Sequence, residues 1–314
     1  MIIYLIIAVL FFAAELVYFR IADHYNIIDH PNERSSHTNI TIRGGGMIFL
    51  LAALCVAVMH PGLWLPVSGV FVIGTISFWD DVHTISSRIR LLFHVIAVTM
   101  MFYYLGLLGT ASWYISILLY IMVIGVINMY NFMDGINGIT GVYSLVVLCG
   151  LQYVNLTQVA FIDADVIWMP LVACVTFLFF NFRKKAKCFA GDVGSVTIAF
   201  WIIMLLLRLI YVAHNWSYIL FLVVYGIDST MTIAHRLIRK ENIFKAHRLH
   251  FYQVLANERK MPHLWVSTVY ALVQGAIIVF IINTPNTTPE SLFLITIIPL
   301  AAIYISLKNR LMRV

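Results

Sequence analysis

The chain has 314 residues, of which 62% are hydrophobic and only 11% are Asp, Glu, Lys or Arg. Soluble domains carry about 25% charged residues, so this composition excludes an ordinary soluble protein and indicates an integral membrane protein. The net charge of +6 does not indicate a nucleic-acid partner, because the Lys and Arg residues lie between apolar runs, where they determine membrane topology.

Apolar runs long enough to cross a bilayer as helices recur along the whole chain. About 30 Å of hydrocarbon requires roughly 20 helical residues, whereas strands of a membrane barrel would be shorter and would alternate. We expect eleven spans, or ten because the second and third runs are short. The expected spans cover residues 2–19, 46–59, 66–79, 91–108, 112–128, 140–155, 165–181, 194–211, 216–234, 264–282 and 291–307. The sequence therefore predicts an all-α, polytopic membrane protein with a single transmembrane domain over residues 1–314.

Lys and Arg residues are distributed unevenly between the two sides that these spans define. Basic residues concentrate in cytoplasmic loops, and with eleven spans every Lys and Arg except Arg208 falls on one side. That side holds the tail from Lys308 and the loops 20–45, 80–90, 128–140, 182–193 and 235–263. We therefore predict an outer N-terminus, a cytoplasmic C-terminus, and a first helix that is retained as a span rather than cleaved as a signal peptide.

Five cytoplasmic segments hold nearly all the carboxylate, amide and imidazole side chains. In chain order, they read DHPNERSSHTNITIRGGG from Asp29, FWDDVHTISSRIR from Phe78, NMYNFMDGINGITG from Asn128, CFAGDVGS from Cys188 and AHRLHFYQ from Ala246. Because all five face one compartment, we expect them to build one site at the cytoplasmic surface of the membrane.

The first segment places Arg34, His37 and Arg43 before a run of three glycines. Basic side chains and exposed backbone N–H groups bind phosphate, so these three residues are candidate substrate ligands. A flexible basic loop is the alternative.

The second segment places two adjacent carboxylates, Asp80 and Asp81, at the end of a span. Like charges repel unless a cation lies between them, so the pair suits a metal ligand, a group that orients phosphate, or a proton acceptor. A plain helix end is the alternative, although acidic residues there oppose the helix dipole. Arg90 follows as a candidate phosphate ligand, unless it only anchors the interface.

The third segment contains Asn131, Asp134, Asn137 and three glycines in the short gap between two spans. Carboxylate and amide oxygens suit Mg²⁺, which keeps several waters and takes one or two protein carboxylates. The glycines allow close approach of the backbone to an anion. A capped turn is the alternative, but a turn needs fewer such residues.

The fourth and fifth segments add one carboxylate and a basic cluster. Asp192 lies between glycines just before a span, where it can hold a cation or cap the helix. His247, Arg248 and His250 suit the binding of a pyrophosphate or a sugar, with a basic helix on the lipid surface as the alternative. Zinc is not indicated, because no third ligand and no HExxH pattern accompany the histidines.

Two polar features lie outside these roles. Asp228, Thr232 and Arg236 share one helical face and indicate a structural polar stripe. Glu15 lies deep within the first span, where a functional and a buried, hydrogen-bonded role are both open. The four cysteines indicate neither a disulfide framework nor a CxxC metal site.

Together, the five segments resemble the polyprenyl-phosphate N-acetylhexosamine-1-phosphate transferase superfamily, which contains the MraY, WecA and TagO enzymes. The match runs in order from about Asp29 to Gln253 and is most similar to the WbpL-like, O-antigen initiating branch. The resemblance implies an enzyme of the bacterial inner membrane that moves a sugar 1-phosphate from a UDP-N-acetylhexosamine to undecaprenyl phosphate. It also implies Mg²⁺ at a cytoplasmic active site, with Mn²⁺ as the alternative cation. A homodimer is an open alternative, since some relatives dimerise.

The resemblance also implies roles for individual residues. Asp80 and Asp81 match the paired aspartates, and we expect one of them to orient or deprotonate the lipid phosphate for direct attack, with a covalent aspartyl-phosphate as the alternative. The other matches are Asn131 and Asp192 as groups that bind Mg²⁺, Asn137 at the uracil contact, and His247, Arg248 and His250 in the segment that reads the sugar and pyrophosphate. Asn137 departs from most bacterial members, which have an aspartate there, and Ile42 replaces the usual proline.

Two other functions are consistent with a polytopic chain. A secondary transporter would place its polar groups near the middle of the bilayer, at paired helix breaks, whereas here they gather at one surface. A catalytically inactive homologue would not need the intact DD, MDG and GD sequences. The identity of the sugar is left open by the sequence.

Overall fold

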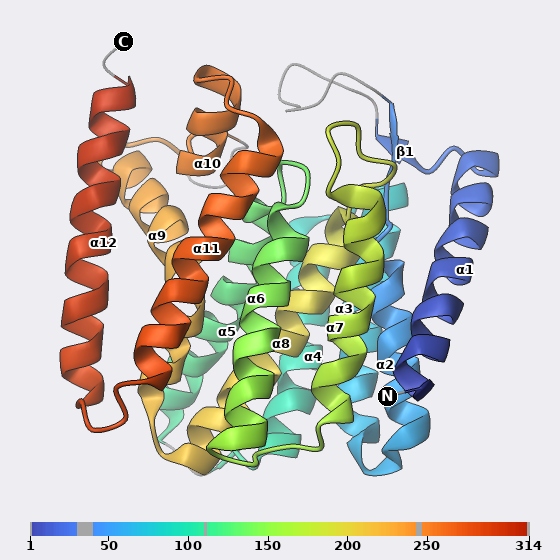
Figure 1. Ribbon diagram of the computed structural model, residues 1–314, viewed down its shortest axis with the longest axis horizontal. Helices are drawn as coiled ribbons and strands as arrows, with labels where there is room; N and C mark the ends of the chain where they lie inside the picture. Colours follow the sequence, from blue (N-terminus) through green and yellow to red (C-terminus); the bar gives the residue numbers. More distant parts are fainter. Residues whose placement is uncertain (1, 30–39, 110–111, 243–246, 313–314) are drawn as a thin grey trace.

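A computed structural model describes residues 2–29, 40–109, 112–242 and 247–312 (Figure 1). Most of these residues are helical. The long helices are α1 (Ile2–His24), α2 (Met47–Met59), α3 (Trp64–Val82), α4 (Ser87–Leu105), α5 (Trp113–Met133), α6 (Ile139–Thr157), α7 (Asp165–Asn181), α8 (Gly191–Ala213), α9 (Val223–Ile238), α11 (His263–Ile282) and α12 (Pro289–Met312). The short elements are the 3₁₀ helices η1 (Pro61–Leu63) and η2 (Trp216–Leu222), helix α10 (Phe251–Gln253), the π-helical turn η3 (Val254–Glu258), and strands β1 (Ile28–Asp29) and β2 (Thr41–Ile42).

The all-α, polytopic prediction is confirmed. Within the described ranges, nine helices are long and apolar enough to cross a membrane. Helices α2 and α7 are apolar but have only 13 and 17 residues, and at about 1.5 Å per residue both are shorter than about 30 Å of hydrocarbon, α2 by the larger amount. The count of eleven spans and the orientation stay predictions.

Helix α8 forms the centre of the bundle. It packs against α2, α3, α5 and α6. Of the residues in its most apolar 18-residue stretch, 72% are buried inside the protein, compared with 17% for α1 and for α12. A helix that is apolar on all sides is enclosed by other helices or by lipid. Figure 1 shows α1 and α12 at opposite edges of the bundle, where their apolar faces suit contact with lipid.

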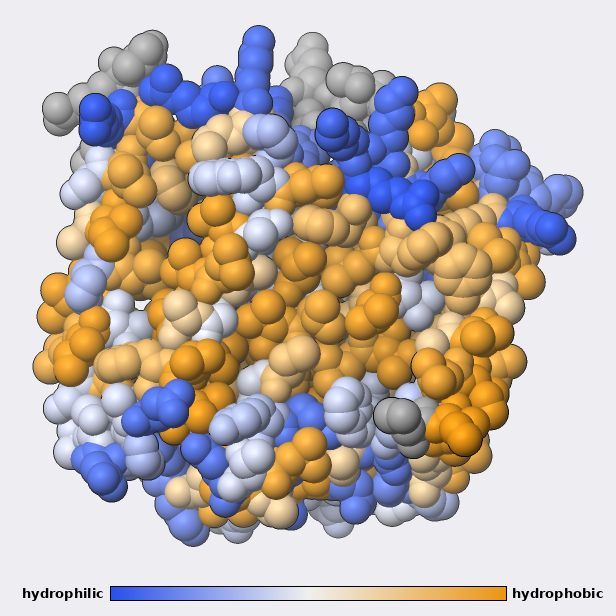
Figure 2. All heavy atoms as spheres, in the orientation of Figure 1, coloured by the Kyte–Doolittle hydropathy of each residue, from blue (hydrophilic) through white to orange (hydrophobic). Residues whose placement is uncertain are grey.

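The two ends of the bundle differ in polarity from its middle. Figure 2 shows a band of apolar side chains with hydrophilic side chains gathered above and below it. In Figure 1, β1, α10 and the connections before α6 and α8 all lie at the end where α12 finishes. The structure therefore brings the polar segments to one end, as the sequence predicts.

Several helices extend beyond the predicted spans into the polar segments. Helix α3 continues to Val82 and α5 to Met133, while α8 begins at Gly191. Asp80, expected in a loop, therefore lies in the last turn of a helix. The reason is that backbone hydrogen bonds continue regardless of side-chain polarity, so hydropathy marks the edge of the apolar layer rather than the end of the helix.

Candidate active site

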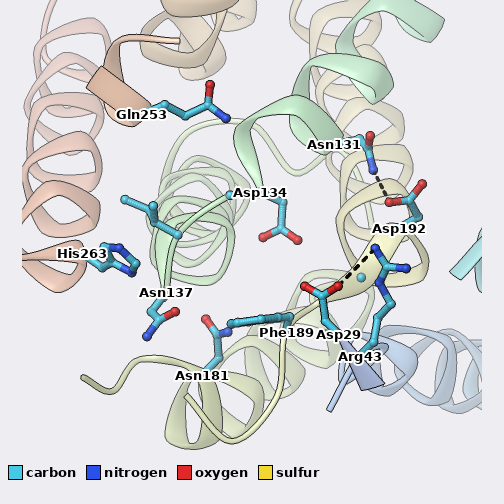
Figure 3. Close-up of a pocket in the computed structure, with 13 residues that line it drawn as sticks. Asp29, Arg43, Asn131, Asp134, Asn137, Asn181, Phe189, Asp192, Gln253 and His263 are labelled. Atoms are coloured by element: carbon cyan, nitrogen blue, oxygen red, sulfur yellow. Dashed lines mark hydrogen bonds and ion pairs between the residues drawn. The ribbon is translucent and has the colours of Figure 1, made fainter. Parts of the chain in front are cut away.

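Four of the five polar segments line one cavity of about 210 Å³ at the polar end of the bundle. Figure 3 shows Asp134 in the middle of the lining residues, with Asn131 and Asp192 on one side and Asn137 and His263 on the other. The full lining comprises Asp29, Arg43, Asn131, Asp134, Gly135, Ile136, Asn137, Asn181, Phe189, Gly191, Asp192, Gln253 and His263. Drug-sized ligands occupy about 300–1,000 Å³, so this cavity fits part of a nucleotide sugar.

The paired aspartates of the second segment do not line the cavity themselves. They contact residues that lie at the start of α8 or bind to it. Asp81 accepts hydrogen bonds from the backbone N–H groups of Asp192 (3.0 Å) and Val193 (2.9 Å), so its two carboxylate oxygens cap the first turn of α8. A Cβ at Gly191 would lie 2.6 Å from Asp81 Oδ2, and its φ is +71°, so glycine is required there. Asp81 thus orients the turn that carries Asp192.

A chain of charged and polar groups connects α3, α4, α5 and α8. Arg90 Nη1 donates to Asp80 Oδ2 (2.6 Å) and to Asp192 Oδ2 (3.2 Å). Asn131 Nδ2 donates to the other oxygen of Asp192 at 2.8 Å. Asp80 also accepts from the backbone N–H of Ile85 (2.7 Å), just beyond the end of α3. The predicted metal residues Asn131 and Asp192 are therefore in direct contact.

Asp134 is the carboxylate most affected by its position in the cavity wall. Burial raises its pKa to about 7, with a further increase from the negative charge of Asp192; the Thr140 hydroxyl and Arg43 act in the opposite direction. The Thr140 hydroxyl donates to Asp134 Oδ1 at 2.7 Å. A half-buried carboxylate near another carboxylate is stabilised by a cation between them.

The donor set around this cavity fits Mg²⁺. It offers the carboxylates of Asp134 and Asp192 and the amide oxygen of Asn131, and Mg²⁺ takes one or two carboxylates while keeping several waters. Over the described ranges, no three His, Cys, Asp or Glu side chains come together as a complete metal cage. Such a set suits a hydrated cation better than a closed structural metal.

Arg43 enters the cavity from a two-stranded sheet. Strand β1 pairs antiparallel with β2, matching Ile28 to Ile42, and the Phe189 N–H donates to the Ile42 carbonyl at 2.8 Å. This arrangement places the Arg43 guanidinium 3.4 Å from Asp81 Oδ1 and 3.9 Å from Asp29 Oδ1. The predicted phosphate ligand is therefore already engaged by carboxylates.

The glycines after Arg43 allow close packing of helices. A Cβ at Gly46 would lie 2.0 Å from the Cα of Gly194, and one at Gly45 would lie 2.5 Å from the sulfur of Cys188. Only hydrogen atoms fit at these contacts, so α2 and α8 begin side by side. The run of glycines that suggests phosphate binding thus has a packing role here.

Asn137 and Asn181 hold the floor of the cavity together. Asn137 Nδ2 donates to the Arg183 carbonyl at 2.8 Å. Asn181 accepts from the Gly138 N–H (2.7 Å) and donates to the Cys188 carbonyl (2.8 Å). The predicted uracil contact therefore lines the cavity, but its amide N–H₂ group binds the connection between α7 and α8.

The basic cluster of the fifth segment lies beside the cavity. Burial first, and then nearby positive charges, lower the pKa of His247 to about 4, so this ring is neutral at pH 7 and offers hydrogen bonds rather than charge. His250 is buried, with its Nδ1 3.5 Å from Asp228 Oδ1. His247, Arg248 and His250 are not among the lining residues, and their substrate role stays a prediction. Arg34 and His37 lie outside the described residues.

Four lining residues with polar side chains are absent from the predicted site: Asp29, Asn181, Gln253 and His263. Asp29 is the first residue of the first matched segment and Gln253 is the last residue of the fifth, so membership of a matched segment could have predicted both as site residues. Asn181 ends an apolar span and His263 begins one, and a single polar residue at a span end has no distinguishing pattern.

The fold and the cavity define a polytopic membrane protein with a carboxylate-bearing site at one end of its helix bundle. Residues 63–210 match the family model for glycosyl transferase family 4. This range includes the four aspartates Asp80, Asp81, Asp134 and Asp192. The chain is also 24% identical over 304 residues to the probable undecaprenyl-phosphate N-acetylglucosaminyl 1-phosphate transferase of Bacillus subtilis (strain 168), covering 89% of this chain and 83% of that protein. These matches confirm the resemblance to the polyprenyl-phosphate N-acetylhexosamine-1-phosphate transferase superfamily, while the WbpL-like branch stays a prediction.

Proposed function

We propose that this protein transfers an N-acetylhexosamine 1-phosphate from a UDP-sugar to undecaprenyl phosphate, releasing UMP, as the first step of a cell-envelope polysaccharide such as an O-antigen. We place it in a bacterial inner membrane as one catalytic domain, with the cavity at the cytoplasmic face. The main support is that four of the five motif segments meet around one cavity, while the second segment holds the cavity wall through Asp81.

Asp134, Asp192 and the amide oxygen of Asn131 would hold Mg²⁺. The bound cation would neutralise charge on the diphosphate of the nucleotide sugar, the main requirement of phosphoryl transfer. The raised pKa of Asp134 makes this loading depend on pH, because a carboxyl group must lose its proton to become a ligand.

The protein would contribute mainly by positioning. A phosphomonoester has its second pKa near ~6, so the lipid phosphate is mostly a dianion at neutral pH. Its oxygen would attack the β-phosphorus of the UDP-sugar, and the bond between that phosphorus and the bridging oxygen would break to release UMP. Both oxygens of Asp81 accept backbone N–H groups, which favours an orienting role and direct attack over a covalent aspartyl-phosphate.

A UMP-release assay tests the proposal. Purified protein in detergent is given undecaprenyl phosphate, Mg²⁺ and a panel of UDP-N-acetylhexosamines, and UMP is measured with and without lipid. Asp192→Asn should lower the rate at least about 100-fold, more than the loss typical of residues that only orient a metal ligand.

Asp163→Asn is the matched control, because it makes the same change at an aspartate whose side chain is 72% exposed at the other end of the bundle. Lipid-dependent UMP release that Asp192→Asn abolishes and Asp163→Asn preserves supports the transferase and identifies its sugar. Folded protein that releases no UMP with any donor would overturn the proposal and favour an inactive homologue or a transporter.

A further inference from the structure

The last helix, α12, contributes a buried lysine that belongs to none of the five motif segments. Lys308 is 4% exposed, and lysine is rarely buried unless it is paired. Its Nζ donates to the Tyr304 hydroxyl (2.6 Å) and to Thr232 Oγ1 (3.0 Å). The Tyr304 oxygen lies 3.4 Å from Asp228 Oδ1, so one hydroxyl stands between a buried cation and a buried anion.

Asp228 in turn holds the start of α10. Its Oδ1 accepts from the Phe251 N–H at 2.8 Å, and its Oδ2 accepts from the Tyr270 hydroxyl at 2.7 Å and from the Tyr252 N–H at 3.3 Å. The His250 ring lies 3.5 Å away. The polar stripe on α9 is therefore the anchor of the fifth motif segment.

Helix α10 reaches the cavity through its last residue. Gln253 lines the cavity and accepts from the His250 N–H at 3.3 Å; Figure 3 shows it on the α10 side of Asp134. Tyr252 donates to the Phe132 carbonyl at 2.9 Å, and a Cβ at Gly135 would lie 2.2 Å from its hydroxyl oxygen. A shift of α10 would therefore move the cavity wall.

We propose that Lys308 is a positioning residue for the nucleotide sugar, acting through Tyr304, Asp228 and α10 on the cavity wall. This inference rests on the proposed transferase function. Removing one partner from a buried polar network leaves the others unpaired, and here the network that loses its ammonium group contains Asp228, which orients the α10 backbone.

Helix α12 has further contacts with this region, so loss of the ammonium group would not detach the helix. Arg259, just beyond η3, donates to the Leu311 carbonyl at 2.6 Å. The rings of Phe251 and Tyr304 meet edge-to-face, with their centroids 5.4 Å apart. A Lys308 variant therefore tests positioning rather than docking of α12.

The kinetic test compares Lys308→Met with Arg310→Met, which removes the same charge from an exposed position on the same helix. With the best UDP-N-acetylhexosamine, Lys308→Met should raise KM for the nucleotide sugar about tenfold, within the range for residues that act through a packed network. The kcat and the KM for undecaprenyl phosphate should change much less, and Arg310→Met should match the wild type. A loss of kcat alone, in proportion to the folded fraction, would overturn the proposal.

Hydrogen exchange gives a readout that needs no turnover. The amides of Phe251 and Tyr252 should exchange faster in Lys308→Met than in Arg310→Met, because Asp228 holds them less firmly. If the wild type releases no UMP, the transferase proposal fails, and faster exchange would still support the coupling between α12 and α10. Equal exchange in the two variants would overturn it.

Tyr304→Phe keeps the test decisive if Lys308→Met does not fold. The variant retains the ring that packs on Phe251 and removes only the hydroxyl between Lys308 and Asp228. It should change KM and amide exchange in the same direction by a smaller factor. Wild-type behaviour in both measurements would overturn the proposal.

Discussion

Carboxylates gather at both ends of the helix bundle, but their partners differ. At the end away from the cavity, Asp163 and Asp165 each lie 3.3 Å from a different nitrogen of His60. The Tyr4 hydroxyl donates to Asp165. These contacts join α1, α7 and the turn after α2, so the cluster serves as a tie between helices.

At the cavity end, two arginines of the described ranges each contact two carboxylates. Among the described residues, Arg43 contacts Asp29 and Asp81, and Arg90 contacts Asp80 and Asp192. Asp134 has a neutral hydroxyl as its hydrogen-bond donor. A balanced cluster stabilises by itself, whereas a surplus of buried negative charge is stabilised by a cationic ligand. Four predictions test this difference.

The largest effect is expected for Asp81→Asn. Asparagine has one side-chain oxygen, so it can accept from only one of the two N–H groups at the start of α8 and turns an N–H₂ group toward the other. UMP release should fall at least about 100-fold, the upper range for residues that orient a metal ligand. Asp165→Asn at the opposite end should lower the thermal stability without changing the rate per folded molecule. A wild-type rate of UMP release in Asp81→Asn would show that Asp81 is not required to orient the start of α8.

A pair of glycine variants compares the packing of the two ends. Gly46→Ala would place a Cβ 2.0 Å from Gly194, whereas a Cβ at Gly62 meets nothing within 4 Å. Overpacking costs about 1–3 kcal/mol, so Gly46→Ala should lower the free energy of unfolding by at least that amount. Gly62→Ala should be nearly neutral. Thermal unfolding in detergent at one scan rate measures both, and equal Tm values would contradict the close contact of α2 and α8.

Asp134→Asn should change how stability depends on pH and Mg²⁺. The pKa of Asp134 is about 7 in the fold and 3.8 ordinarily, so the folded state holds the proton more tightly between these values. Its contribution to stability is present below about pH 4 and is lost as the pH rises through about 7. Without metal at pH 8, Asp134→Asn should therefore unfold about 2–4 °C above the wild type, the shift that ~1 kcal/mol makes in a chain of this size.

Mg²⁺ should reverse that order, because it stabilises only a protein that binds it. At pH 8, Mg²⁺ should raise the Tm of the wild type and of Asp163→Asn, but not that of Asp134→Asn. An equal Mg²⁺ response in all three proteins would exclude Asp134 as a ligand.

The smallest effect is expected for Asp163→Asn itself. Exposed ion pairs contribute about 0–1 kcal/mol, and Asp165 still contacts His60 in this variant. The Tm should fall by no more than about 2 °C. A larger decrease would mean that the tie at this end is as critical as the contacts around the cavity.

Hydropathy and motif order account for much of what was predictable. The apolar runs predicted an all-helical membrane protein, and nine helices among the described residues are long and apolar enough to cross a membrane. The motifs predicted that Asn131, Asp134 and Asp192 share a site, and all three line the cavity. Helix ends were less predictable, because α3 and α5 continue into polar sequence with unbroken backbone hydrogen bonds.

The hydrogen-bonding roles of Asp81 and Asp228 could not be predicted from hydropathy or from motif order. Asp81 accepts from the N–H of a residue 111 positions later in the chain, and Asp228 accepts from an N–H 23 residues away while sharing its network with Lys308. Neither partner is marked by spacing, since an acceptor for a backbone N–H can come from any residue that the fold brings near it.

The sequence by itself determined the membrane class, the all-helical architecture and the gathering of polar segments at one end, because hydropathy and charge act locally along the chain. Only the tertiary structure decided which carboxylates enter the cavity and which stand behind it. That distinction depends on the packing of α8 against α2, α3 and α5, and on backbone N–H groups that the sequence does not mark.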